Sequence, residues 1–311
     1  MGAGIAWGVF SLLFSLLFSP SGGNDPAEWF VLGINLLETG AFLIAALLCF
    51  RNWRSPQIVS GRTVWLWIGL GLIMYVLGNV FFFLWGNVWG LDPAVSFADF
   101  FYILCYVFVS IGMFQAVLPR RLNLELSQWL IVLGIGLATV LLSLFVKLQS
   151  VETTPLSMGI GSSPTAYLIA QAPPVDGAAP VAPAPLVAPA EVPASAPGWA
   201  LQVNALLEPF AGIVGLLYLL GDIVLLIIAG TLLVAFWGGR FSQSWKLIAI
   251  AAVFLYVADM FFLYTTNTDS YVEGSVWEVF WTLSAVFFWL GAVVEHAVSV
   301  NSRRSSRRRR G

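Results

Sequence analysis

The sequence has little charge and few of the residues that carry most cofactor chemistry. Only 10% of its 311 residues are charged, and it contains one histidine and two cysteines. A haem held by two histidines and a three-histidine zinc site both need more histidines than His296 alone. A retinal Schiff base needs a lysine within a helix, and neither Lys147 nor Lys246 lies in the interior of an apolar stretch. We therefore expect no cofactor and no metal site of these kinds.

Apolar residues are abundant instead, at 59% of the chain. Soluble proteins carry about 25% charged residues, more than twice the fraction here, so this composition indicates an integral membrane protein. The runs are continuous rather than alternating, which favours helices over a β-barrel. The predicted fold is an all-α polytopic membrane bundle of seven transmembrane helices, or eight if the short apolar segment 5–19 also crosses. The predicted spans are 29–50, 64–85, 97–118, 128–146, 210–237, 245–264 and 276–298.

Lysine and arginine residues lie almost entirely on one side of this topology. Thirteen of the 14 follow alternate spans or the last span, and only Lys147 falls on the opposite side. The positive-inside rule makes the arginine-rich side cytoplasmic, so we expect a plasma-membrane protein with a cytoplasmic C-terminus. The six arginines between Arg303 and Arg310 are expected to contact anionic lipid headgroups, and they give no specific recognition of nucleic acid.

The two ends of the chain resemble each other in their polar residues. Asn79 matches Asp259 at an offset of 180, Asp99 matches Glu278 at 179, and Glu38 lies near the position that matches Asp222. These matches predict two parallel three-helix repeats joined by an extra span. The predicted parts are an apolar membrane-associated segment 1–28, a first repeat 29–118, a connecting span 128–146, an outer proline- and alanine-rich linker 147–209, a second repeat 210–298 and a basic tail 299–311.

Five carboxylates within the predicted spans form the candidate site. A charge at the centre of a span costs about 2.5–3.5 kcal/mol on insertion scales, so these residues need a reason to be there. A rise of about 1.5 Å per residue places Glu38 and Asp222 near the midplane, with the other matched pairs roughly 6 and 12 Å further out. Tyrosine and tryptophan donors share these helix faces and are expected to bond the carboxylates. The candidate ligand-, proton- or cation-binding residues are Glu38, Asn79, Asp99, Tyr102, Asp222, Asp259, Glu278 and Trp281.

The segment 96–106 contains Ser96, Ala98, Asp99, Tyr102 and Tyr106. This pattern resembles the "PSxADxxYLxxY" motif in the multi-span N-terminal sensor modules of bacterial diguanylate cyclases and phosphodiesterases. The segment 274–281 resembles the second such motif, although Glu278 stands where aspartate is usual and no proline precedes Ser96. The sequence ends 13 residues after Val298, which leaves no room for an output domain. The resemblance therefore implies a free-standing sensor-like unit of a bacterial inner membrane that acts through a cytoplasmic or membrane partner.

Three functions remain open on these grounds. The first is a non-enzymatic sensor or ligand-binding module with an acidic and aromatic site in its outer half. The second is a proton- or cation-coupled transporter, and the third is a structural subunit of a membrane complex. The polar residues also have a structural interpretation, because they can hold helices together, and Asp99 and Glu278 can stabilise helix starts. An aspartyl protease pair of Asp222 and Asp259 is a further minor interpretation.

Overall fold

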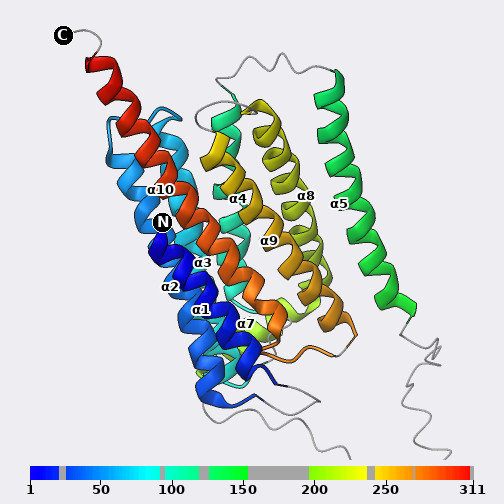
Figure 1. The fold of residues 1–311 in the computed structure, drawn as a ribbon. Helices are drawn as coiled ribbons and strands as arrows, with labels where there is room; N and C mark the ends of the chain where they lie inside the picture. The colour runs from blue at the N-terminus through cyan, green and yellow to red at the C-terminus, as the bar shows by residue number, and fades with distance from the viewer. Residues whose placement is uncertain are drawn as a thin grey trace, which may run out of the picture.

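The computed structural model describes residues 1–20, 26–91, 95–118, 126–152, 196–236, 242–268 and 270–308. All regular secondary structure in these ranges is helical, and seven helices are long and apolar enough to cross a membrane. The predicted all-α polytopic bundle is therefore confirmed (Figure 1). The helices are α1 (Gly2–Phe18), α2 (Glu28–Arg54), α3 (Arg62–Phe83), η1 (Leu84–Val88), α4 (Ala98–Val117), α5 (Leu126–Glu152), α7 (Gly198–Leu207), η2 (Glu208–Phe210), α8 (Ala211–Ala235), α9 (Ser242–Asn267), η3 (Val276–Glu278) and α10 (Val279–Arg308).

The spans lie where they were predicted, with one difference before α8. The end of the predicted linker forms helix α7, and the short turn η2 joins it to α8. Pro209 lies in that turn, where its missing N–H and fixed φ interrupt regular α-helix. α7 packs on η1, the short helix that follows α3, through Trp85, whose indole Nε1 donates to Asn204 Oδ1 at 3.3 Å. The proline- and alanine-rich part of the linker, residues 172–195, lies outside the described residues.

Six helices form a ring made of two trios. α3 packs between α2 and α4, and α9 packs between α8 and α10. The trios meet twice, because α4 packs on α8 and α10 packs on α2. α2 and α8 run in the same direction through the bundle (Figure 1). This is the arrangement expected of parallel repeats related by an axis along the membrane normal.

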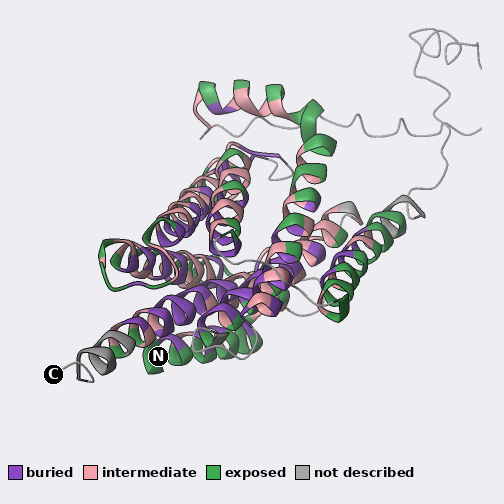
Figure 2. Ribbon diagram, turned by 90° about the horizontal axis from the view of Figure 1, so that it is seen from above, coloured by how far each residue is buried: buried purple, intermediate pink, exposed green. Residues whose placement is uncertain are grey.

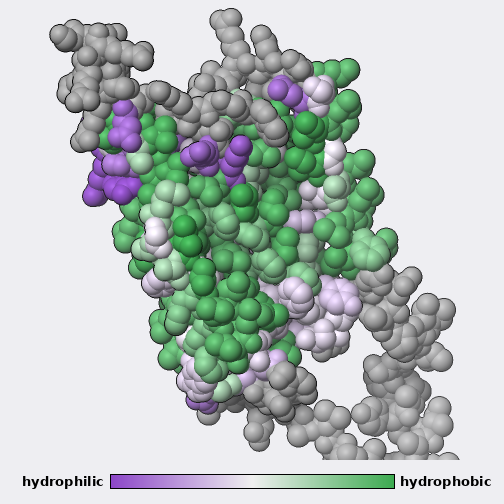
Figure 3. Space-filling model, viewed as in Figure 1, coloured by the Kyte–Doolittle hydropathy of each residue, from purple (hydrophilic) through white to green (hydrophobic). Residues whose placement is uncertain are grey.

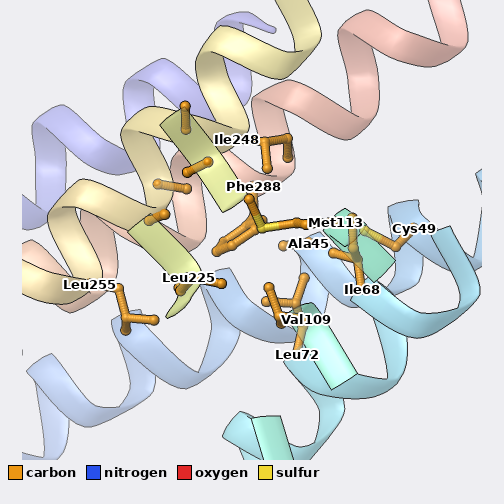
Figure 4. Close-up of a cluster of buried hydrophobic side chains, with 14 of the residues drawn as sticks. Ala45, Cys49, Ile68, Leu72, Val109, Met113, Leu225, Ile248, Leu255 and Phe288 are labelled. Carbon is orange, nitrogen blue, oxygen red and sulfur yellow. The ribbon is translucent and has the colours of Figure 1, made fainter. Parts of the chain in front are cut away.

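Matched apolar residues of the two trios fill the centre of the ring. Trp65 and Trp245 are both fully buried, and their ring centroids lie 6.0 Å apart. Ile68 and Ile248 are likewise fully buried in the same cluster. Figure 4 shows the middle of this cluster, where Met113 of one trio and Phe288 of the other lie close together. The apolar core thus joins the trios into one packed body.

Both ends of the bundle are distinguished by charge, and we name them accordingly. The basic end carries Arg51, Arg54 and Arg62, and α10 finishes there. The acidic end is the opposite one, where α4, α8 and α10 begin and where Glu273 lies. Hydrophobic side chains cover most of the face between hydrophilic patches in Figure 3.

Helices α1 and α5 lie outside the ring. α5 packs on α8 and α9, and only 22% of its most apolar stretch is buried, against 56% in α10. α1 packs on α10 and α2, which places the segment 5–19 along the side of the bundle rather than in a loop. It remains short, at 17 residues. Figure 2 shows its outer face as exposed, whereas α10 beside it is largely buried.

Candidate functional site

The first trio holds a polar group made of one residue from each of its helices. Asn79 on α3 donates through Nδ2 to Glu38 Oε1 on α2 at 2.9 Å. Tyr102 on α4 donates its hydroxyl to Asn79 Oδ1 at 2.8 Å. The Tyr102 ring lies against Gly78, where an added Cβ would be 2.5 Å from a ring carbon. Glycine at position 78 therefore lets the tyrosine reach Asn79.

The second trio repeats this plan with different residues. Trp281 on α10 donates through Nε1 to Asp259 Oδ1 on α9 at 2.7 Å, as Tyr102 does to the matched Asn79. Asp222 on α8 stands in the place of Glu38 and is fully buried. The hydroxyl of Tyr106 donates to both Asp222 and Asp259, so the two carboxyl groups lie side by side. The predicted matching of polar positions thus extends to their hydrogen bonds.

Two tyrosines cross between the trios at the α4–α8 contact. Tyr106 of α4 donates to Asp222 of α8 at 2.8 Å. In return, Tyr218 of α8 donates to Asp99 Oδ1 of α4 at 2.6 Å. Gly221 makes room for the crossing, because a Cβ there would lie 2.8 Å from the Tyr106 ring. We call these two bonds the reciprocal tyrosine–aspartate pairs.

The matched acids Asp99 and Glu278 also stabilise the starts of their helices. Ser96 N–H donates to Asp99 Oδ2 at 2.6 Å, and Ala98 N–H donates to Ser96 Oγ at 3.2 Å. Gly274 N–H donates to Glu278 Oε2 at 3.0 Å. These bonds satisfy backbone donors near a helix N-terminus, as the structural interpretation expected. Asp99 in addition joins the other trio through Tyr218, whereas Glu278 accepts from Tyr271 of its own loop.

The predicted site residues contact one another across different depths. Glu38 and Asn79, which a rise of about 1.5 Å per residue places about 6 Å apart in depth, are joined by a side-chain hydrogen bond of 2.9 Å. Asp222 and Asp259 likewise share one hydroxyl donor. Long side chains let residues at different depths form hydrogen bonds, which a calculation from the helix rise alone does not predict. Six of the eight predicted residues therefore form two triads, one in each trio.

Glu273 is a site residue that sequence reasoning missed. Its carboxylate accepts from Asn87 Nδ2 at 3.1 Å and from Asn35 Nδ2 at 3.3 Å, which joins the ends of α2 and η1 to the loop before α10. Partial burial raises the pKa of Glu273 above its ordinary value, and the two amide hydrogen bonds oppose that rise. It lies in a loop outside the spans, so it is not among the charged residues within the predicted spans.

A second missed group lies at the basic end, around Glu295. This carboxylate is fully buried, with Ser60 Oγ donating to Oε1 at 2.6 Å and Ser244 Oγ donating to Oε2 at 2.9 Å. Trp65 Nε1 in turn donates to Ser60 Oγ at 2.9 Å. These hydrogen bonds join α10 to the α2–α3 loop and to the start of α9.

The chemistry of the site is that of buried carboxylates held by neutral donors. In the described residues, tyrosine, tryptophan and asparagine side chains donate hydrogen bonds to Glu38, Asp222 and Asp259. Within the same residues, no group of three or more His, Cys, Asp or Glu side chains is arranged to hold a metal ion. Such a site can bind a proton or a small cation, because a buried carboxylate otherwise lacks a counter-charge.

Comparisons with known proteins give no further assignment. No protein-family model, curated protein or solved structure matches the chain.

Proposed function

We propose that this chain is a non-enzymatic membrane sensor in which a proton bound at the α4–α8 contact changes how the two trios pack. The membrane is a bacterial inner membrane in this proposal, with the basic end in the cytoplasm. The observation that carries the proposal is that Tyr106 of one trio donates to both Asp222 and Asp259 of the other. A proton gained or lost by this carboxyl pair alters a bond between trios, not within one.

The surroundings of the pair support its use as a proton site. Asp222 is fully buried, and its Oδ2 has no hydrogen-bond partner in the described part of the chain. Leaving a buried carboxylate oxygen without a partner is costly, and a shared proton or a cation relieves that cost. Ionisable groups deep in a membrane bundle are functional more often than groups elsewhere.

Helix α10 gives the site a route to the opposite end. Trp281 at the start of α10 donates to Asp259, and the same helix continues to Arg308. On the way it carries Glu295, which is bonded to Ser60 and Ser244. A shift of α10 at the acidic end is therefore transmitted to the loops at the basic end. We propose that a cytoplasmic or membrane partner detects this shift there.

The test is infrared difference spectroscopy of the full chain in lipid nanodiscs over a range of pH. A protonated carboxyl band that titrates in the wild type should be lost in Asp222→Asn and in Asp259→Asn. Glu208→Gln is the matched control, because Glu208 is an exposed acid in η2. A band that persists in both aspartate variants would overturn the proposal.

The parallel repeats favour one alternative, a proton-coupled transporter, because carriers often place acids between two such repeats. Proteoliposomes that contain a pH-sensitive dye separate the two functions. A sensor leaves the internal pH unchanged under an imposed gradient. A proton flux that is present in the wild type and absent in Asp259→Asn would replace the sensor with the transporter.

A further inference from the structure

A small polar cavity lies between α1, α2 and α10, at the second contact between the trios. Its polar lining consists of Ser11, Ser15, Glu38, Glu278 and Thr282, and it offers about 10 Å³ of space for water. A cavity needs roughly 10–15 Å³ on this measure to hold one water molecule. The cavity therefore suits an occupant about the size of one water molecule.

The matched positions of the two repeats show how this contact differs from the α4–α8 contact. Ile34 in the first repeat matches Tyr218 in the second, because these two residues are as far apart in the sequence as Glu38 and Asp222. Ala285 in the second repeat matches Tyr106 in the first, because these two residues are as far apart in the sequence as Asp99 and Glu278. Both crossing tyrosines are thus replaced by apolar residues at the α10–α2 contact. Ala285 is fully buried, and Ile34 lines the cavity beside the two glutamates.

For two hydroxyl groups in the lining, no hydrogen bond is found within the described residues. The side chains of Ser15 and Thr282 are only 5% and 4% exposed, and neither hydroxyl makes a hydrogen bond within the described residues. Ser11 differs, because its hydroxyl donates to Trp7 O at 2.9 Å. Buried hydroxyls are usually hydrogen-bonded, so two unpartnered ones in the same cavity point to an occupant that they contact.

We propose that this cavity binds a dehydrated monovalent cation of the size of Na⁺. Every polar lining group is an oxygen ligand, and oxygen ligands are those that hard cations prefer. Glu38 and Glu278 supply negative charge from different trios, and Ser15 and Thr282 supply neutral oxygens. Mg²⁺ usually keeps several of its waters, for which the cavity has no room.

Helix α1 completes this site. Its buried face consists of Gly4, Gly8, Ser11 and Ser15, and a Cβ at Gly4 would lie 3.0 Å from Leu290 of α10. The close approach brings Ser11 and Ser15 to the cavity wall. Trp7 Nε1 fixes α1 on the other side by donating to Leu37 O of α2 at 3.0 Å. The site thus exists only with α1 docked, and it does not depend on the proton site proposed at Tyr106.

The experiment measures the midpoint of thermal unfolding of the full chain in nanodiscs at constant ionic strength, with NaCl replacing choline chloride. A saturable rise with Na⁺ is expected, since a ligand that binds only the folded state stabilises it. In Ser15→Ala/Thr282→Val, the Na⁺ concentration for half of the rise should increase by about tenfold or more. KCl, CaCl₂ and MgCl₂ are compared in parallel at one pH and at a lower pH.

The matched control is Ser143→Ala/Thr139→Val, which removes two buried hydroxyls from α5, away from the cavity. It should keep the wild-type response to Na⁺. Direct binding of ²²Na⁺ to the wild type keeps the proposal testable even where a variant fails to fold. The proposal is overturned if Na⁺ and choline act alike, if only pH shifts the midpoint, if a divalent cation alone stabilises the protein, or if the double variant keeps the wild-type response. Asp259→Asn, which disrupts the proton site, should keep its response to Na⁺.

Discussion

The two contacts between the trios have the same backbone plan and opposite contents. At the α4–α8 contact, Tyr106 and Tyr218 cross the boundary and bond to aspartates of the other trio. At the α10–α2 contact, Ala285 and Ile34 stand in those places, and α1 covers the cavity that results. Two positions per repeat thus distinguish the contact that carries the crossing tyrosines from the contact that borders the cavity. A duplicated fold can therefore place different side chains at two equivalent contacts.

The largest effect is expected from removing the donor shared by the carboxyl pair. Tyr106→Phe leaves Asp222 and Asp259 without their hydroxyl partner at a buried contact. The free energy of unfolding should fall by about 3 kcal/mol, because hydrogen bonds to charged or buried acids contribute most. Chemical denaturation in mixed micelles measures it. A loss below that of Tyr218→Phe would contradict the view that the pair is the centre of this contact.

A steric change at the same contact should lower the free energy of unfolding somewhat less. In Gly221→Ala, the new Cβ lies 2.8 Å from the Tyr106 ring, so that ring or α8 must move. Overpacking of this kind costs about 1–3 kcal/mol. The residue that matches Gly221 in the first trio is Leu37, which is large, and the residue that matches Tyr106 in the second trio is Ala285, which is small. A double-mutant cycle with Tyr106→Ala should show that removing the ring relieves the cost, and additive losses would refute that coupling.

Removing the hydroxyl of Tyr218, the other tyrosine that crosses between the trios, should lower the free energy of unfolding less. Tyr218→Phe removes one bond to Asp99, but Ser96 N–H still donates to that carboxylate at 2.6 Å. A loss of about 1 kcal/mol in the free energy of unfolding is expected, near the mean for one hydrogen bond. The same denaturation assay measures it, with Tyr264→Phe as the control, an exposed tyrosine of α9. An equal loss in both variants would show that the crossing bond contributes nothing.

The smallest effect concerns Glu273, beside the α10–α2 contact. Its pKa is raised in the folded state, so the folded state binds the proton more tightly than the unfolded state does. The contribution to stability is therefore present at low pH and is lost as the pH rises through the folded-state pKa. Glu273→Gln should flatten this part of the pH dependence of the unfolding midpoint. An unchanged pH profile, with Glu208→Gln as control, would contradict the assignment.

Much of the fold was accessible from the sequence, because hydrophobic length and the periodic return of polar residues determine it. The seven spans and the matched positions Asn79 and Asp259 are examples. The hydrogen-bond partners were not accessible. Tyr218 lies four residues before Asp222, so the two share one face of α8, but Tyr218 bonds to Asp99 of another helix. Spacing along one helix predicts which way a side chain points, whereas the rotation of the neighbouring helix determines which residue that side chain contacts.

Contacts of α1 and of the basic end show the same limit of sequence-based prediction. No periodicity within α1 could reveal that Gly4 and Gly8 pack on α10, since that contact joins segments that lie far apart in the sequence. The group around Glu295 depends on Ser60 and Ser244, which lie in separate repeats. Nonlocal polar contacts of this kind leave little trace in a single sequence.

The closure of the ring through α10 has a consequence for biogenesis. α10 is translated after α1 and α2, yet it packs on both of them. Until α10 has left the ribosome, Glu38 and the small-residue face of α1 lack the α10 side of their contact. α1 and α2 therefore contact lipid or the insertion machinery on that side until α10 is inserted.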